Sequence, residues 1–186
     1  MKRVFDVVIA LISLPLLGVA ICLTALMVRL SSPGPVLYWS DRVGRYNRVF
    51  RMPKFRSMKV DTPELASHLL QNPEQWLTPI GSFLRKSSLD ELPQLWCILI
   101  GHMSFVGPRP ALFNQEDLIA LRTEMGVHKL LPGLTGWAQI NGRDDLPIPR
   151  KVQLDTEYLQ RQSFLFDLRI LWMTVLKVLA RNGVSH

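Results

Sequence analysis

A run of 22 residues without a charge, from Val7 to Val28, constrains this chain more than any other feature. At about 1.5 Å per residue, a helix of this length can cross the hydrocarbon core of a bilayer. The run is too long for the apolar region of a signal peptide, and no small-residue cleavage site follows it before Arg29. The sequence therefore predicts that residues 1–30 form a membrane-inserted helical segment.

Basic residues flank this run on both sides, which complicates a simple span. Lys2 and Arg3 precede the run and Arg29 follows it, yet positive charge beside a membrane segment favours the cytoplasmic side. Pro15 offers a second arrangement, because proline removes one helical hydrogen bond and clashes with the preceding turn. A helix that breaks there, with Ser13 as a partner for the freed backbone, would re-enter one leaflet and return to the same side. The residues alone favour neither this re-entrant helix nor a simple signal anchor.

The composition excludes several classes of protein. With 48% hydrophobic and 20% charged residues, the chain is neither disordered nor a coiled coil. Its two cysteines, Cys22 and Cys97, cannot form a disulfide framework and match no metal-binding spacing. A zinc site is not expected, because no two of the four histidines are four residues apart.

The net charge of +7 predicts an anionic partner: nucleic acid, anionic lipid or a phosphorylated substrate. Seven of the basic residues lie between Arg42 and Val60, a stretch that contains no acid. Within it, Lys54 and Arg56 alternate with apolar residues, a pattern that suits contacts with phosphate. A basic face on anionic lipid explains the stretch as well, at about 1 kcal/mol for each Lys or Arg near the surface.

Adjacent carboxylates at Asp90 and Glu91 are the strongest candidates for chemistry. Ser88 and Glu91 match a helix-capping box, and apolar residues continue this predicted helix to Gly101. The pair would then lie at a helix N-terminus, where backbone N–H groups and the helix dipole favour negative charge. Such a pair is more often two ordinary first-turn acids. Neighbours on a helix do not face each other, however, so one could act as nucleophile or metal ligand and the other as base.

Three arginines are candidate phosphate contacts. Arg85 lies just upstream of the two carboxylates, Arg109 lies between two prolines, and Arg143 ends a loop rich in turn residues. An arginine fixed by its neighbours suits bidentate recognition of phosphate. A plain proline turn explains Arg109 equally well.

Two further segments have recognisable patterns. Residues 36–39 and 49–50 are short apolar segments that flank the turn residues 44–47, and they predict a β-hairpin. Residues 164–181 predict an apolar helix with a sparse basic face. Such a helix either lies in a membrane interface or packs on the core of the domain.

Eight motifs, taken in order, resemble those of a known family. They are Lys2-Arg3-x-Phe5-Asp6, Gly34-Pro35-Val36, Arg42-x-Gly44, Lys54-Phe55-Arg56-Ser57-Met58, Ser88-Leu89-Asp90-Glu91-Leu92-Pro93-Gln94, Met103-Ser104-x-Val106-Gly107-Pro108-Arg109-Pro110, Pro132-Gly133-x-Thr135-Gly136 and Asn141-Gly142-Arg143. The family is that of the bacterial sugar transferases, the monotopic polyprenyl-phosphate phosphoglycosyl transferases. The resemblance covers nearly the whole chain, which looks like the minimal catalytic form.

The residues and the resemblance together predict an α+β, membrane-associated fold. Residues 1–30 would form a re-entrant hydrophobic helix, and residues 31–186 a small, mostly helical catalytic domain with a short β-hairpin and interfacial amphipathic helices. The resemblance implies the bacterial inner membrane, with the catalytic domain on its cytoplasmic face.

The resemblance also implies an activity. The family transfers a sugar-1-phosphate from a UDP-sugar to polyprenyl (undecaprenyl) phosphate and releases UMP, the first membrane step of polysaccharide or glycoconjugate assembly. Asp90 matches the nucleophile that forms an aspartyl phosphosugar intermediate, and Glu91 matches its partner. Magnesium is the family's cofactor, with Asp90 as its candidate ligand.

The candidate substrate contacts are Lys54, Arg56, Arg85, Arg109 and Arg143. The expected partners are a UDP-sugar, undecaprenyl phosphate and inner-membrane lipids, but no nucleic acid; a homo-oligomer is left open. The competing class is a non-enzymatic membrane anchor that binds anionic lipid or nucleic acid through the basic stretch, and it would need neither the carboxylate pair nor a fixed Arg109.

Overall fold

The computed structural model describes residues 1–63, 72–142 and 146–180, which form a mixed helix and sheet fold. The helices are α1 (Lys2–Ser31), α2 (Gly81–Ser87), α3 (Leu95–Ile100), α4 (Glu116–Glu124), α5 (Trp137–Ile140), α6 (Ile148–Arg161) and α7 (Phe164–Leu179). The strands are β1 (Leu37–Val43), β2 (Val49–Phe55), β3 (Ser104–Val106), β4 (Ala111–Leu112) and β5 (Gly133–Thr135). Short 3₁₀ helices lie at Arg45–Asn47, Pro73–Trp76, Leu89–Gln94 and Val127–Lys129.

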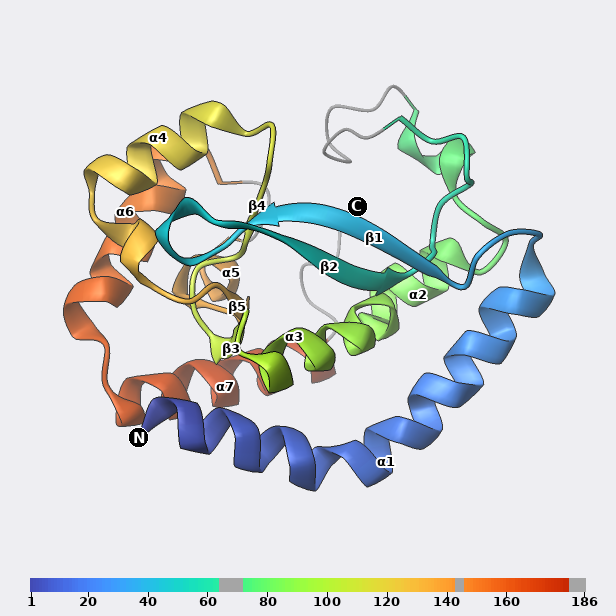
Figure 1. Ribbon diagram of the computed structural model, residues 1–186, viewed down its shortest axis with the longest axis horizontal. Coiled ribbons are helices and arrows are strands. Elements are labelled where there is room, and N and C mark those ends of the chain that lie inside the picture. The colour runs from blue at the N-terminus through green and yellow to red at the C-terminus, as the bar shows by residue number, and fades with distance from the viewer. Residues whose placement is uncertain (64–71, 143–145, 181–186) are drawn as a thin grey trace.

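The predicted hairpin is confirmed as β1 and β2, which cross the middle of the molecule in Figure 1. The two strands pair antiparallel from Leu37 opposite Phe55 to Val43 opposite Val49, so both are longer than the sequence indicated. Strand β4 pairs with the other edge of β1, while β3 and β5 form a separate parallel pair.

One face of the hairpin packs on α3. Phe50 and Met52 of β2 are buried together with Leu95 and Ile98 of α3, because the apolar side chains of both elements exclude water there. The 3₁₀ helix Leu89–Gln94 leads directly into α3 and lies against β2. The packing of α3 on the hairpin therefore fixes the position of the Asp90–Glu91 pair.

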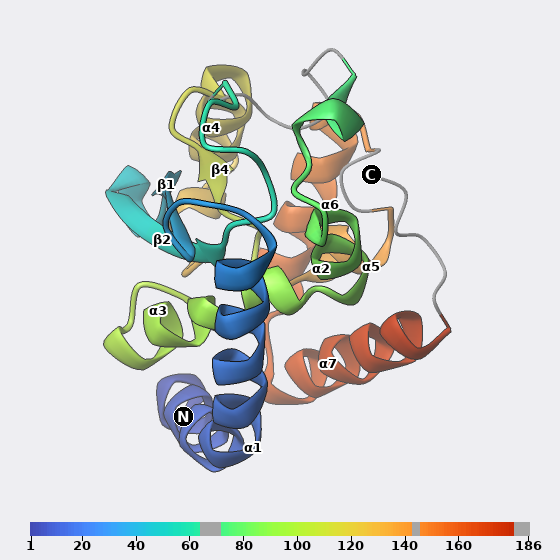
Figure 2. The same cartoon turned by 90° about the vertical axis from the view of Figure 1, so that its right-hand side faces the viewer.

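Helix α1 is continuous and bends in its middle, as Figures 1 and 2 show. Pro15 lies near the centre of this 30-residue helix, and proline is a common cause of such a kink. The predicted break at Pro15 is thus a bend within a continuous helix. Ser13 donates a hydrogen bond to the carbonyl oxygen of Ala10 at 3.0 Å, which is not the carbonyl that Pro15 frees one position further on.

Both ends of α1 contact the rest of the chain, and one side of its middle packs on the core through Leu17 and Ile21, whereas the other side is exposed. At the N-terminal end, Lys2 pairs with Asp167 of α7 at 2.6 Å, and Arg3 donates to carbonyl oxygens at the end of α3. At the C-terminal end, Val28 is buried with Phe55 of β2. Exposed apolar side chains between the two ends include Leu11, Ile12, Leu14, Leu16, Val19 and Leu23. By length and composition, α1 could cross a membrane.

Helix α7 confirms the predicted C-terminal helix as far as Leu179, and Arg181 lies outside the described residues. Much of its exposed surface is apolar, formed by Phe164, Leu165, Leu168, Trp172, Val175 and Leu176. In both views α7, α3 and the N-terminal half of α1 lie toward the same edge of the molecule (Figures 1 and 2). Helix α3 likewise exposes two large apolar side chains, Trp96 and Ile100.

Candidate active site

Three charged side chains, Lys54, Glu91 and Arg109, meet between β2, the 3₁₀ helix Leu89–Gln94 and the loop after β3. The Nζ of Lys54 donates to Oε1 of Glu91 at 2.9 Å, and Nη2 of Arg109 donates to the same oxygen at 2.9 Å. The side chains of Lys54 and Glu91 are only 16% and 19% exposed, so water screens these contacts little. The structure thus brings together three of the residues that the sequence singled out.

The carboxylate pair lies in the first turn of a 3₁₀ helix, not of an α-helix. Ser88 adopts a left-handed conformation (φ 57°) that ends α2, and its side chain makes no capping hydrogen bond. The predicted capping box is therefore wrong, because the backbone at Ser88 closes one helix before the next begins. The predicted end at Gly101 is confirmed by its left-handed conformation after α3.

The two carboxylates differ in their electrostatic surroundings. Burial raises the pKa of Asp90 above the usual 3.8, and the charges of Lys54, Arg85 and Arg109 do not cancel this rise. Burial also acts to raise the pKa of Glu91, but Arg109 and Lys54 outweigh it and hold that pKa far below the usual 4.5. Paired carboxylates whose pKa values are pushed apart are typical of a site that divides two chemical roles.

Hydrogen bonding follows the same division. Glu91 accepts from both neighbouring cations, whereas no residue of the described chain donates a hydrogen bond to the carboxylate of Asp90. Asp90 is nonetheless largely buried, with 7% of its surface exposed. Glu91 is therefore fixed by its contacts, and Asp90 is left available to react or to bind a ligand.

The remaining predicted contacts have different positions. Arg85 of α2 lies close enough to Asp90 for its charge to lower the pKa of that carboxyl. Arg56 is buried and donates to the carbonyl oxygens of Ser32 and Pro33, so it holds the segment after α1 and is not part of the cluster at Glu91. Arg143 lies outside the described residues.

The carboxylates fit a magnesium ion only in part. The described residues contain no group of three or more His, Cys, Asp or Glu side chains that could hold a metal. Magnesium commonly takes one or two carboxylates and completes its shell with water and substrate phosphates. Asp90, with no described hydrogen-bond donor, fits the role of such a single carboxylate ligand.

Close contact between Gly107, just after β3, and Gly133 of β5 sets the position of the Arg109 loop. Parallel strands β3 and β5 pair Val106 with Thr135, and the next residue, Gly107, donates to the carbonyl oxygen of Thr135 at 2.9 Å. A Cβ atom on Gly133 would lie 2.1 Å from the backbone nitrogen of Gly107, so no side chain fits there. The motifs that contain Gly107 and Gly133 therefore need glycine because two backbone segments lie too close together there for a side chain.

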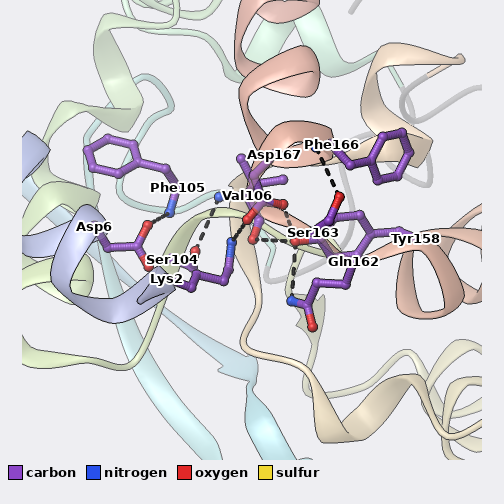
Figure 3. Close-up of polar contacts among 10 residues, drawn as sticks. All are labelled: Lys2, Asp6, Ser104, Phe105, Val106, Tyr158, Gln162, Ser163, Phe166 and Asp167. Carbon is purple, nitrogen blue, oxygen red and sulfur yellow. Dashed lines mark hydrogen bonds and ion pairs between the residues drawn. The ribbon is translucent and has the colours of Figure 1, made fainter.

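A buried polar network fixes the other side of β3 (Figure 3). Asp6 of α1 accepts a hydrogen bond from the backbone N–H of Phe105 at 3.2 Å. The hydroxyl of Tyr158 lies 3.3 Å from the carbonyl oxygen of Val106 and donates to Asp167 at 2.7 Å. Asp167 also binds Lys2, so the network links both terminal helices to the strand that leads to Arg109. The sequence did not predict it, because 165 residues separate Lys2 from Asp167.

Comparison with known proteins agrees with this arrangement. The family model for bacterial sugar transferases matches residues 1–181. The chain is 42% identical over 185 residues to the UDP-glucose:undecaprenyl-phosphate glucose-1-phosphate transferase of Escherichia coli, covering 95% of this chain and 40% of that protein. It is 42% identical over 188 residues to the uncharacterized sugar transferase EpsL of Bacillus subtilis, covering 100% of this chain and 91% of that protein.

A third relative, from Aeromonas hydrophila, is a UDP-N-acetylgalactosamine-undecaprenyl-phosphate N-acetylgalactosaminephosphotransferase. It is 35% identical over 190 residues, covering 98% of this chain and 44% of that protein. The chain thus spans less than half the length of the Escherichia coli and Aeromonas relatives. Since the family model covers nearly the whole chain, this protein belongs to the bacterial sugar transferase family.

Proposed function

We propose that this chain transfers a sugar-1-phosphate from a UDP-sugar to undecaprenyl phosphate, with UMP as the leaving group. The observation that carries the proposal is the contrast within the carboxylate pair. Glu91 is held by two cations, while Asp90 has a raised pKa and no hydrogen-bond donor among the described residues. A carboxylate of this kind is suited to act as a nucleophile.

The reaction follows in two steps. A carboxylate oxygen of Asp90 attacks the phosphorus that carries the sugar; an Asp90–phosphorus bond forms, and the bond to the UMP oxygen breaks. A phosphate oxygen of undecaprenyl phosphate then attacks the same phosphorus and releases the Asp90 carboxylate. The product is undecaprenyl-diphosphate-sugar: one phosphate comes from the UDP-sugar and one from the lipid, and the other phosphate of the UDP-sugar leaves in UMP.

The basic residues of the site hold Glu91 in place and offset the negative charge of the substrate. Lys54 and Arg109 keep Glu91 ionised and in place, so that it can orient the incoming group. Arg85 lies near Asp90, where its positive charge favours the approach of an anionic diphosphate. Magnesium bound by Asp90 and the substrate phosphates would add charge neutralisation at the diphosphate.

The direct test is UMP release from a panel of UDP-sugars in detergent with magnesium and undecaprenyl phosphate. We expect release above background with at least one UDP-sugar, and the preferred sugar is then read from the panel. The relatives' names include both glucose and N-acetylgalactosamine, so the panel must contain both. No release from any UDP-sugar would overturn the proposal.

The structure does not favour the non-enzymatic anchor, because much of the basic stretch is engaged within the chain. Lys54 binds Glu91, Arg56 binds the segment after α1, and Arg42 donates to the carbonyl oxygen of Pro110 at 3.2 Å. These side chains therefore do not form one open basic surface.

The pH dependence of the first step provides a further prediction. Asp90 must be ionised to attack phosphorus, and its pKa is raised, so activity is expected to fall with decreasing pH through an apparent pKa above 3.8. Glu91 stays ionised across this range because its pKa is lowered. The measurement is single-turnover UMP release against pH, with circular dichroism at each pH to exclude unfolding. An acid limb at or below 3.8 would contradict the role of Asp90.

We also propose that α1 enters and leaves the membrane on the cytoplasmic side. Both ends of the helix contact the same domain, through Lys2 at one end and Val28 at the other, and many apolar side chains between them are exposed. A straight helix of 30 residues would be about 45 Å long and would separate these ends. The exposed apolar side chains of α1, α3 and α7 would then rest in the membrane–water interface.

A labelling experiment tests this topology. A cysteine added ahead of Lys2, in a variant with Cys22→Ser and Cys97→Ser, is expected to resist an impermeant thiol reagent in intact cells and to react after permeabilisation. Pro15→Leu should straighten the helix and expose a fraction of the cysteine to the outside. Leu16→Ala, which keeps the proline, should retain the parent pattern. Labelling of the parent from outside would show that α1 spans the membrane.

A further inference from the structure

A buried ion pair on the far side of Arg109 is not used by the proposed chemistry. Arg122 of α4 donates from Nε and Nη2 to Oδ2 of Asp155 in α6, at 2.9 and 2.6 Å. The side chains of Arg122 and Asp155 are only 9% and 1% exposed. Charges removed from water to this extent are retained only where excellent geometry compensates for their desolvation.

The third contact of Arg122 points toward the candidate active site. Its Nη1 donates to the backbone carbonyl oxygen of Arg109 at 2.8 Å. The side chain of Arg109 reaches the other way, to Oε1 of Glu91 at 2.9 Å. Arg122 therefore holds the backbone of Arg109, and the side chain of Arg109 holds the carboxylate of Glu91.

Helix α6 lies against the same segment at two points. Asp155 fixes Arg109 through Arg122, and the hydroxyl oxygen of Tyr158, one turn further along α6, lies 3.3 Å from the carbonyl oxygen of Val106. Residues three apart on a helix share a face, so both side chains approach the strand-to-loop segment from one surface. The segment that carries Arg109 is thus close to α6 before the arginine and hydrogen-bonded to it, through Arg122, at the arginine.

We propose that Arg122, oriented by Asp155, is a positioning residue that fixes the Arg109 loop so that the Arg109 guanidinium stays on Glu91. The role of Arg122 in catalysis rests on the proposed function, whereas its effect on the contact between Arg109 and Glu91 does not. The planar guanidinium makes three directed contacts at once: two reach Asp155 and one reaches the carbonyl of Arg109. A lysine at this position would keep the charge opposite Asp155 but could not reproduce this geometry.

The experiment compares Arg122→Lys with the parent protein. Lysine preserves a buried positive charge, so the variant is expected to fold, which thermal unfolding checks. Arg150→Lys is the matched control: Arg150 lies on α6, is exposed, and contacts Gln153. We expect Arg122→Lys to lower kcat/KM for UMP release by about 10- to 100-fold, the size that small misplacements of reacting groups produce. Arg150→Lys should remain within twofold of the parent.

The position of the Arg109 guanidinium separates positioning from a general structural role. In the parent protein, Nη2 of Arg109 donates to Oε1 of Glu91 at 2.9 Å. If the Arg109 loop is released in Arg122→Lys, this contact is lost and the surroundings of the Arg109 guanidinium change. This is followed by ¹⁵N NMR of the arginine side chains, with the Arg109 signal assigned by Arg109→Lys, and requires no turnover; Arg150→Lys should leave that signal unchanged.

A double-mutant cycle completes the test. If Arg122 acts through Arg109, the variant Arg122→Lys/Arg109→Lys should be about as active as Arg109→Lys alone. An unchanged Arg109 guanidinium signal in Arg122→Lys, or losses of activity that multiply in the double variant, would overturn the inference. An inactive parent protein would instead reject the proposed function, and the NMR comparison would still decide whether Arg122 positions Arg109.

Discussion

Replacing Asp90 by asparagine is expected to reduce UMP release by about 10,000-fold or more, the size seen when a catalytic nucleophile is removed. Asparagine keeps the shape of the side chain but cannot attack phosphorus as a carboxylate does. The substitution breaks no hydrogen bond of the described chain, so the variant should fold normally. The loss should appear even without undecaprenyl phosphate, because UMP leaves in the first step.

The measurement is UMP formed in a single turnover, with the phosphosugar adduct on the protein followed by mass spectrometry. Asp117→Asn is the matched control, since Asp117 lies exposed in the first turn of α4. We expect an adduct on the parent and on this control, and none on Asp90→Asn. Activity of Asp90→Asn within tenfold of the parent would exclude the covalent route.

Removal of divalent cations by EDTA is expected to lower UMP release by about 100-fold or more, since a bound cation contributes several kcal/mol of charge stabilisation. Added magnesium should restore the activity. Because the described residues offer no cluster of three ligands, most of the shell must come from substrate phosphates and water. The magnesium concentration needed for half-maximal activity should therefore fall as the UDP-sugar concentration rises.

Thermal unfolding controls for an effect on the fold. A cation held mainly by substrate should leave the melting temperature of the substrate-free protein unchanged in EDTA. Full turnover in EDTA would reject a role for the metal. A large drop in melting temperature would instead indicate a structural ion, contrary to the arrangement around Asp90.

The parts of the fold that local chemistry determines were predictable from the sequence. The hairpin follows from two apolar segments around turn residues, and α3 ends at Gly101 because glycine readily adopts the left-handed conformation. The predicted capping box at Ser88 was wrong because the local pattern does not decide the structure there. The same short pattern fits the start of a helix, yet in the fold Ser88 lies at the end of α2.

Helices α4 and α6 were among those not predicted, and this omission hid part of the site. In α6 the buried positions 152, 155 and 158 follow a helical spacing that could have revealed the helix. The pairing of Asp155 with Arg122 could not have been found in this way, because it joins two helices 33 residues apart in sequence. The sequence also named Asp90 and Glu91 without showing which of them Lys54 and Arg109 would bind, since that depends on long-range packing.

The contact between Lys2 and Asp167 has a consequence for synthesis of the chain. A ribosome adds roughly 5–20 residues per second, so Asp167 appears roughly 10–30 s after Lys2. In that interval the N-terminal half of α1 lacks its partner on α7, although its partners on α3 and β3 are made earlier. The contact between α1 and α7 therefore forms only once α7 has been made, and a chain truncated before α7 would leave Lys2 without its partner Asp167.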